Sequence, residues 1–563
     1  MTKLGGPEIA ERLRELAGYL RLAGESPWKA KAYEGAASAV EALGSSLDEL
    51  VATGRLTETP GIGEKLAAAI TELHQTGTTR RLEGLRADFP PGLIELTNIP
   101  GLRLPRILAL HEGLGVRDLE DLRAAAQAGK VRNLRGFGER IEQKILDGIA
   151  RYQARPTRVR LVDAQERVQA LAETAGRVPG VSGVLIAGGV RRWKETVGTL
   201  RLVARAEQSG PALDAFLHAQ PLGRLEQVGA DCLRGRLSDG VAVEVCLVPP
   251  PLFAAAVVRQ TGARAHVQHL DALARERGFE LARVEGPEEA AIYRRLGLPE
   301  LAPELREDAG EIEAAQAGDA FGDLVTAADI QGMVHCHTTH SDGRASIEEM
   351  ARAAEAMGMS YLTITDHSPL AFYAGGLSAE GLAQQWDEIA AVQERVGIRI
   401  LRGTESDLLA DGALDYPDAI LEKLDVIIGS VHNRFHLDEE EMTRRLVRAM
   451  RLPVFKIWGH PLGRLILRRE PLACRMDEVL DAAASSRVAI EINGDPYRLD
   501  LPPEHIREAR RRGIPFVIST DAHSVSDLHH LPFGVGIARR GWVRRHEVLN
   551  ARPVAEFAAA VRP

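Results

Sequence analysis

Two histidines one residue apart, His335 and His337, lie in the stretch VHCHTTHSDG at residues 334–343. Side chains alternate along a β-strand, so both imidazoles would face one side and Cys336 the other. Asp342 follows after a short polar turn. Two imidazoles and a carboxylate aimed at one point suit a divalent metal ion. From this stretch alone, a strand-capping histidine beside a core histidine is an equally good interpretation.

The same residue types recur where other apolar runs of the C-terminal half end. These runs are the stretches LTITDH, ILRGTESD, DVIIGSVH, FKIWGH and FVISTDAH. They contain Asp366, His367, Glu405, Asp407, His432, His460, Asp521 and His523. Such runs predict buried parallel strands, and helical patterns such as residues 346–357 and 476–485 lie between them. Strands alternating with helices predict an α/β barrel or a doubly wound sheet, with polar residues at the C-terminal ends of the strands. We therefore expect six histidines and three carboxylates at one rim.

The series HxH…D, TDH, GxE, SVH, GHP and DAH, across about residues 329–563, resembles the polymerase-and-histidinol-phosphatase (PHP) superfamily of metal-dependent phosphoesterases. The resemblance implies a distorted seven-stranded (βα) barrel with up to three ions, two of them bridged by Glu405. The ligands that it implies are His335, His337, Asp342, His367, Glu405, His432, His460, Asp521 and His523. Imidazoles and carboxylates without thiolate suit manganese, zinc or iron, and clustered ions favour phosphoester hydrolysis. Arg464, Arg468 and Arg469 are candidates for holding a substrate phosphate, with a solvated surface as the alternative.

The length of 563 residues predicts several domains, and the composition is that of a globular protein. The four cysteines, Cys232, Cys246, Cys336 and Cys474, show no paired spacing, so we expect free thiols and a cytoplasmic protein. No apolar run is long enough to predict membrane insertion. The net charge of −9 argues weakly against nucleic acid, but the acids concentrate in the C-terminal half.

Three similar glycine turns, TPGIGEKLAAAI (59–70), IPGLRLPRILAL (99–110) and LRGFGERIEQKIL (134–146), each open a predicted helix. Glycine permits a tight turn that leaves helix-start N–H groups free to bind a phosphate oxygen without reading base sequence. These turns resemble helix–hairpin–helix motifs, which implies DNA contacts from Gly61, Gly63, Lys65, Gly101, Gly136 and Gly138. The middle copy has Arg103 in place of its second glycine. A basic stretch beside the third copy comprises Arg132, Arg135, Arg140, Lys144, Arg151, Arg155, Arg158 and Arg160.

Residues 183–206, GVLIAGGVRRWKETVGTLRLVARA, look like a nucleotidyltransferase palm, and residues 258–266 and 291–315 match the segments that follow it. The order of all these segments resembles bacterial family X DNA polymerases with a C-terminal PHP domain. The resemblance implies multidomain α+β and α/β architecture. Its domains would be a helical DNA-binding domain (1–90), a helix–hairpin–helix fingers-like domain (91–155), a palm (156–248), a thumb-like domain (249–316), a linker that allows pivoting (317–328) and the PHP domain (329–563).

The palm departs from that family in its carboxylates. The two catalytic aspartate positions fall on Thr199 and Arg201, and Glu244 remains as the third carboxylate. An arginine in a magnesium site inverts the local charge, so we expect weak binding of magnesium or manganese there. Gly188, Arg192, Thr261 and Gly262 remain as nucleotide-binding candidates, whereas Gly189, Arg259, Gln260, Val267 and Ala69 replace other functional positions of the family.

These features predict a DNA-repair protein that acts on gapped or damaged DNA. Its PHP site would be a manganese-dependent 3′→5′ exonuclease or an AP-endonuclease, and its palm would mainly bind DNA. Alternatives are a gap-filling DNA polymerase that uses dNTPs, a non-catalytic DNA-end scaffold with a structural metal, and a small-molecule phosphatase of the histidinol-phosphate kind.

Overall fold

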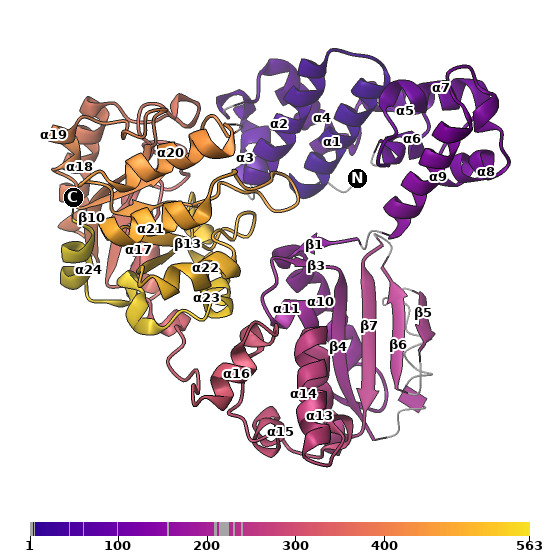
Figure 1. The fold of residues 1–563 in the computed structure, drawn as a ribbon. Helices are drawn as coiled ribbons and strands as arrows, with labels where there is room; N and C mark the ends of the chain where they lie inside the picture. The colour runs from indigo at the N-terminus through magenta and orange to yellow at the C-terminus, as the bar shows by residue number, and fades with distance from the viewer. Residues whose placement is uncertain are drawn as a thin grey trace. The chain divides into compact units, whose positions relative to one another are not determined.

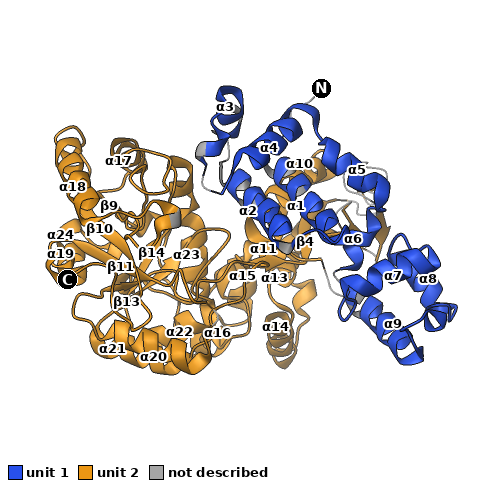
Figure 2. Cartoon of the chain, turned by 90° about the horizontal axis from the view of Figure 1, so that it is seen from above, with its two compact units in different colours: residues 1–156 blue, residues 157–563 orange. Residues whose placement is uncertain are grey.

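The computed structural model describes residues 4, 6–43, 46–59, 61–97, 99–154, 157–207, 211–212, 224–228, 231–237, 240–435 and 437–562. Arg155 of the predicted basic stretch lies outside these residues. The chain divides into two compact units, Met1–Pro156 and Thr157–Pro563, which are coloured separately in Figure 2.

The first unit is helical. Its α-helices are α1 (Gly6–Leu22), α2 (Pro27–Leu43), α3 (Ser46–Thr53), α4 (Glu64–Thr76), α5 (Arg80–Asp88), α6 (Gly92–Leu96), α7 (Leu104–Leu114), α8 (Leu119–Gln127) and α9 (Glu139–Ala154). The apolar stripe of α1 serves two hydrophobic cores, since Ile9 and Leu13 belong to one and Leu16 and Leu20 to the other. Helix α1 therefore joins the two halves of this unit.

The second unit begins with a five-stranded sheet of order β2-β4-β7-β6-β5, which we call the palm-like sheet. Its strands are β2 (Val181–Ala187), β4 (Thr199–Ala206), β5 (Arg224–Gln227), β6 (Cys232–Arg236) and β7 (Ala242–Val248). Helices α10 (Leu161–Gly176), α11 (Gly188–Arg191) and α13 (Phe253–Thr261) pack on it, and β1 (Val159–Arg160) pairs with β3 (Thr196–Val197). Helices α14 (Arg264–Glu276), α15 (Glu289–Arg295) and α16 (Glu311–Gln316) follow.

The prediction that all four cysteines are free is wrong for Cys232 and Cys246, which form a disulfide. Strands β6 and β7 are antiparallel, and their register places these two cysteines directly opposite each other. Their spacing in the sequence contains no such information, because the pairing of two strands decides it. Cys336 and Cys474 are free. The cysteines therefore no longer support the inference of a reducing compartment.

The C-terminal part is a seven-stranded parallel barrel, as predicted (Figure 1). Its strands pair in chain order: β8 (Gly332–Met333), β9 (Tyr361–Ile364), β10 (Arg399–Asp407), β11 (Val426–Ser430), β12 (Ile457–Trp458), β13 (Ala489–Asn493) and β14 (Phe516–Ser519). A parallel bridge between Cys336 and Ala522 joins the segments after the first and last strands. The wholly buried strands β9, β11 and β14 lie within the predicted runs LTITDH, DVIIGSVH and FVISTDAH. Strand β13 is also wholly buried but was not among those runs.

Helices alternate with the barrel strands. They are α17 (Ile347–Ala356), α18 (Ala379–Gln393), α19 (Asp418–Leu421), α20 (Glu439–Met450), α21 (Met476–Ser486), α22 (Pro503–Arg511), α23 (Leu531–Arg540) and α24 (Val554–Val561). Ser346 and Glu349 form a capping box that starts α17, because each side chain satisfies a backbone N–H of the other residue. This alternation leaves the C-terminal ends of the strands free to carry functional residues.

The segment predicted as a pivoting linker, residues 317–328, is instead packed on the barrel domain. Arg544 binds the carboxylates of Asp319 and Asp323, each at 2.5 Å, and its guanidinium lies over the Phe321 ring. Val325 is fully buried and its N–H donates to the carbonyl of Val543. Glycine and alanine content suggested flexibility, but the charged and aromatic residues of the segment fix it. Among the described helices, none is long and apolar enough to cross a membrane.

Candidate metal centre

The nine predicted ligands all follow or end strands of the barrel. His335, His337 and Asp342 follow β8, His367 follows β9, Glu405 lies in β10, His432 follows β11, His460 follows β12, and Asp521 and His523 follow β14. Parallel strands bring their C-terminal ends to the same edge, so side chains separated by up to 188 positions in the sequence come together. The nine residues form one continuous cluster at this rim, which we call the rim cluster.

Three groups within the rim cluster have the spacing of metal sites. His337, Asp342, His367 and His523 form one, His335, His337 and Asp521 the second, and His367, Glu405 and His432 the third. Within each group the ligand atoms lie within 4.8 Å of one another. His337 and His367 are each shared by two groups, so the three groups are contiguous.

Glu405 occupies the middle of the rim cluster. Its carboxylate oxygens lie 2.8 Å from His460 Nε2, 3.0 Å from His367 Nδ1 and 3.3 Å from His432 Nε2. His335 and His337 are also within 3.6 Å. One carboxylate thus faces five imidazoles, as expected of a residue with oxygens for more than one ion.

The rim cluster contains buried polar atoms that have no hydrogen-bonding partner among the described residues. They include His335 Nε2, both ring nitrogens of His337, His432 Nδ1 and both carboxylate oxygens of Glu405. An unpaired buried polar atom is costly, so such a concentration of them is expected where another group completes the site. Imidazole and carboxylate donors with no thiolate fit a divalent transition-metal ion.

The electrostatics of the rim cluster also favour a cation. Burial, together with nearby His523 and His367, lowers the pKa of His337 to about 4, so this imidazole stays neutral and able to bind a metal. Burial opposes charge on His523 too, but Asp342 and Asp521 raise its pKa to about 9. Burial likewise opposes ionisation of Glu405, yet the surrounding histidines hold its pKa well below the ordinary value. The carboxylates therefore remain ionised.

The site opens to solvent on one side. The side chains of Asp342 and His523 are each 30% exposed, whereas His335, His337 and Glu405 are almost completely buried. A substrate would therefore approach past Asp342 and His523.

Glu491 is a functional candidate that the sequence analysis missed. It lies in the buried strand β13, and its carboxylate accepts hydrogen bonds from His335 Nδ1 at 2.6 Å, Ser519 Oγ, the backbone N–H of His460 and Asn493 Nδ2. These contacts orient His335 so that Nε2 faces Glu405 and Asp521, each at 3.5 Å. A glutamate between isoleucines in AIEIN was the available signal, because an acid is rare inside a buried strand.

Asp366 and Asp407, which follow the same strands as the predicted ligands, support the rim cluster from its edge. Asp366 accepts from Thr338 Oγ1 and Gln385 Nε2, both at 2.6 Å. Asp407 lies 3.4 Å from His432 Nδ1. Both carboxylates therefore fix loops or imidazoles beside the rim cluster.

The arginines proposed to hold phosphate have other partners in the structure. Arg464 donates from Nε to the carbonyl of Arg498 at 3.0 Å and from Nη2 to the carbonyl of Leu499. Arg468 lies over the ring of Tyr497 and Arg469 over that of Phe435. The arginine that contacts the rim cluster is Arg498, with Nε 3.3 Å from Asp521 Oδ2.

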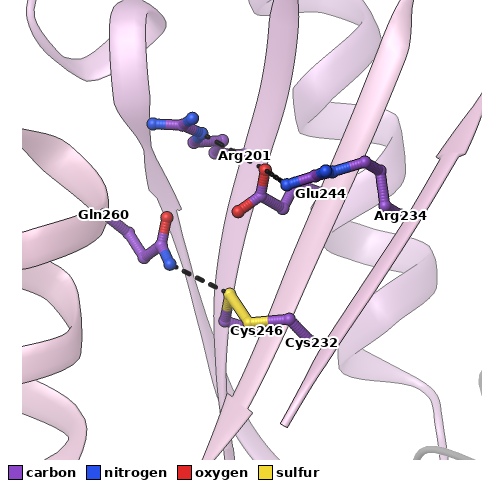
Figure 3. The surroundings of a disulfide bond; sticks show 6 residues. All are labelled: Arg201, Cys232, Arg234, Glu244, Cys246 and Gln260. Atoms are coloured by element: carbon purple, nitrogen blue, oxygen red, sulfur yellow. Dashed lines mark hydrogen bonds and ion pairs between the residues drawn. A yellow bond between two sulfur atoms is a disulfide. The ribbon is translucent and has the colours of Figure 1, made fainter. Parts of the chain in front are cut away.

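In the palm-like sheet, β4 and β7 are parallel and place Arg201 beside Glu244 (Figure 3). The carboxylate of Glu244 lies 3.8 Å from Arg201 Nε and 3.3 Å from Arg234 Nη2. Glu244 thus lies between two guanidinium groups.

The predicted nucleotide-binding residues lie around the same sheet. Gly188 has φ +67°, and a Cβ there would lie 3.1 Å from the Arg201 side chain. Arg192 is nearly buried, pairs with Glu307 at 2.8 Å and donates to the carbonyl of Thr261. At Gly262, a Cβ would lie 2.9 Å from Val267. These residues are therefore occupied by contacts within the protein.

The six predicted DNA-contacting residues of the first unit are all exposed: Gly61, Gly63, Lys65, Gly101, Gly136 and Gly138. The first glycine of each turn has φ between +84° and +86°, a conformation that favours glycine. The apolar residue after it, Ile62, Leu102 or Phe137, is buried. Each turn thus anchors an apolar side chain while its glycines stay at the surface.

Comparison with known proteins agrees with this architecture. Residues 334–495 match the PHP domain family, residues 5–79 a helix-hairpin-helix domain and residues 93–151 a SAM-like helix-hairpin-helix tandem. The chain is 34% identical over 569 residues to a Bacillus subtilis protein named DNA polymerase/3'-5' exonuclease PolX, covering 99% of both proteins. A probable phosphatase of Thermoanaerobacter sp. (strain X514) is 28% identical across 38% of this chain and 88% of its own length. The chain therefore belongs to the bacterial family X DNA polymerases that carry a C-terminal PHP domain.

Proposed function

We propose that this protein is a manganese-dependent 3′→5′ exonuclease that hydrolyses DNA phosphodiesters at the rim cluster. The observation that carries the proposal is the convergence of nine imidazole and carboxylate side chains. Six of them, His335, His337, His367, Glu405, His432 and His460, have buried nitrogen or oxygen atoms with no hydrogen-bonding partner among the described residues. The Bacillus subtilis relative is named for a 3′→5′ exonuclease, and it aligns over the whole length of this chain.

The rim cluster residues suit this chemistry. When bound, divalent ions supply an acidified water and positive charge beside the phosphate oxygens. Neutral His337 and the ionised carboxylates of Asp342, Glu405 and Asp521 would hold them, up to three in number. Asp342 and His523 line the exposed side, where the DNA end would enter.

We further propose that the palm-like sheet contributes DNA binding and little nucleotide transfer. Two metal ions at a polymerase site need several carboxylates, and here Glu244 is flanked by Arg201 and Arg234. Arg192 is occupied by Glu307 and Thr261. The exposed glycine turns of the first unit would bind backbone phosphates of DNA without sequence preference.

The test is an assay on gapped DNA labelled at either end, with manganese and with or without dNTPs. Wild type, His335→Ala and Glu244→Ala are compared. We expect stepwise shortening from the 3′ end that is lost in His335→Ala and unchanged in Glu244→Ala. Shortening that persists in His335→Ala would refute the assignment to the rim cluster.

Gap-filling polymerisation is the second candidate, because the name of the full-length relative includes DNA polymerase. Primer extension that is robust in manganese and abolished by Glu244→Ala would favour it. Such a result would overturn our proposal for the palm-like sheet while leaving the nuclease proposal intact.

A further inference from the structure

Arg498 lies beside the rim cluster on the loop between β13 and α22. Its Nε is 3.3 Å from Asp521 Oδ2 and 3.6 Å from Asp495 Oδ2. Its Nη1 is buried and has no hydrogen-bonding partner in the described part of the chain.

The fork of an arginine suits a phosphate, because its nitrogens can donate in parallel to two oxygens. In Arg498 the contact with Asp521 uses Nε, and Nη1 has no acceptor among the residues that the structure describes. A buried donor left unpaired costs free energy unless a ligand accepts from it. Arg498 therefore has both the position and an unused donor for an anionic group bound at the rim cluster.

We propose that Arg498 binds the phosphate that is to be cleaved. We also propose that the β1–β3 pair and the palm-like sheet, together called the palm-like domain, position Arg498 by holding the loop of residues 495–501. The proposal rests on the proposed phosphodiesterase function and adds a substrate-binding residue and two positioning residues to it.

The first positioning contact runs through Arg464. Arg464 donates to the carbonyls of Arg498 and Leu499, and its Nη2 lies 3.6 Å from Glu195 Oε1. Glu195 precedes β3 beside the palm-like sheet, and its other oxygen binds Arg540 at 2.8 Å. Glu195 thus fixes the guanidinium that holds the backbone of Arg498.

The second positioning contact is an aromatic one. Arg160 of β1 places its guanidinium carbon 4.2 Å from the centre of the Tyr497 ring. The carbonyl of Tyr497 also accepts from the N–H of Ile466 at 2.7 Å. The residue next to Arg498 is therefore held between the palm-like domain and the barrel. Through Arg160 and Glu195, the palm-like domain would influence the rate of hydrolysis at the rim cluster.

The phosphate-binding role is tested in the full-length protein with Arg498→Ala and Arg498→Lys. Arg512→Ala, which removes a guanidinium paired with Asp477 and Asp481 near the surface, is the matched control. Three quantities are measured: kcat and KM for hydrolysis, manganese bound per chain, and the inhibition constant of inorganic phosphate.

We expect Arg498→Ala to weaken inhibition by phosphate about 10- to 100-fold, the usual worth of hydrogen bonds to a charged group. The amount of manganese bound per chain stays as in wild type. Arg498→Lys recovers part of the lost phosphate affinity, because lysine restores the positive charge but not the parallel N–H donors of a guanidinium. Unchanged phosphate inhibition in Arg498→Ala overturns the inference while wild-type hydrolysis still supports the nuclease. Absence of hydrolysis in wild type overturns both.

The positioning role is tested with Glu195→Gln, Arg160→Ala and the corresponding double variants with Arg498→Ala. Glu173→Gln, an exposed substitution on α10, is the control. If the contacts act through Arg498, each single variant weakens phosphate inhibition, and the double variants lose no more than Arg498→Ala alone. Additive losses in the double variants would show that the palm-like domain acts by another route and would overturn the positioning role.

Discussion

Replacing Glu491 by glutamine isolates the contribution of a residue that touches no proposed substrate and yet orients the rim cluster. Four donors converge on this carboxylate, two on each oxygen: His335 Nδ1 and Ser519 on one, the His460 N–H and Asn493 on the other. Glutamine keeps the shape but turns one of the two acceptors into a donor. Both orientations of the amide therefore conflict with the site.

If the new NH₂ group faces His335, this imidazole must accept at Nδ1 and carry its proton on Nε2. Nε2 is the atom that lies 3.5 Å from Glu405 and Asp521, so a metal ligand is lost. If the NH₂ group faces the N–H of His460, a buried backbone donor has no acceptor. Losing one or two charge-assisted hydrogen bonds costs about 2–4 kcal/mol in the metal-free protein. Loss of a partner that orients a metal-binding histidine weakens metal affinity about 10- to 100-fold.

Two measurements test this reasoning. The stability of the metal-free protein is measured by urea unfolding, and the manganese affinity of the folded protein is measured by equilibrium dialysis. Glu478→Gln, at an exposed residue of the same domain, is the control and should match wild type in both measurements. The reasoning is refuted if Glu491→Gln unfolds at the wild-type urea concentration and binds manganese with wild-type affinity.

Three further expectations follow from other parts of the structure. Burial opposes ionisation of Glu195, but Arg540 and Arg464 lower its pKa from 4.5 to about 2. Ionised Glu195 should therefore contribute about 3 kcal/mol to the free energy of unfolding above pH 4.5, and this contribution should be lost as the pH falls toward 2. The urea unfolding curves of wild type and Glu195→Gln should then converge as the pH is lowered, and a difference that stays constant would contradict this. The Cys232–Cys246 disulfide joins residues that are 14 positions apart, and its reduction should lower the free energy of unfolding by about 3 kcal/mol. Urea unfolding with and without dithiothreitol measures this difference, and equal stability would contradict the expectation. Gly429→Ala places a Cβ 2.0 Å from the Phe455 ring and should cost about 1–3 kcal/mol in thermal unfolding, whereas Gly322→Ala, with open space, should be neutral.

The barrel and the position of its rim residues could be predicted because both depend on local patterns. Each buried strand is a short apolar run, and the polar residues directly after it must lie at the C-terminal end of a parallel strand. His335 and His337 illustrate the rule: alternation predicted that both imidazoles face one side, and the histidines and acids after the other runs then favoured a shared metal site. The HxH stretch and the five runs after it left few other arrangements, although the run that forms β13 was not among them.

Contacts between distant segments could not be predicted in this way. The Cys232–Cys246 disulfide depends on the register of β6 and β7. Arg464 lies three residues after the GHP motif and therefore looked like a phosphate ligand, but its guanidinium donates to the backbone carbonyl of Arg498. Glu491 accepts from residues that are 156, 28, 31 and 2 positions away. Only the packed barrel brings these groups together.

Within residues 183–206, which resemble a polymerase palm, Trp193 and Glu195 make contacts that do not depend on nucleotide transfer. Trp193 packs edge-on against Phe533, and a Cβ at Gly536 would lie 2.4 Å from its ring. Glu195 pairs with Arg540 and lies near Arg464. All of these partners belong to the barrel domain. Trp193 and Glu195 therefore join this segment to the barrel whether or not nucleotide transfer takes place beside it. We expect a substitution at either residue to disturb the barrel and, through the Arg498 loop, the rim cluster.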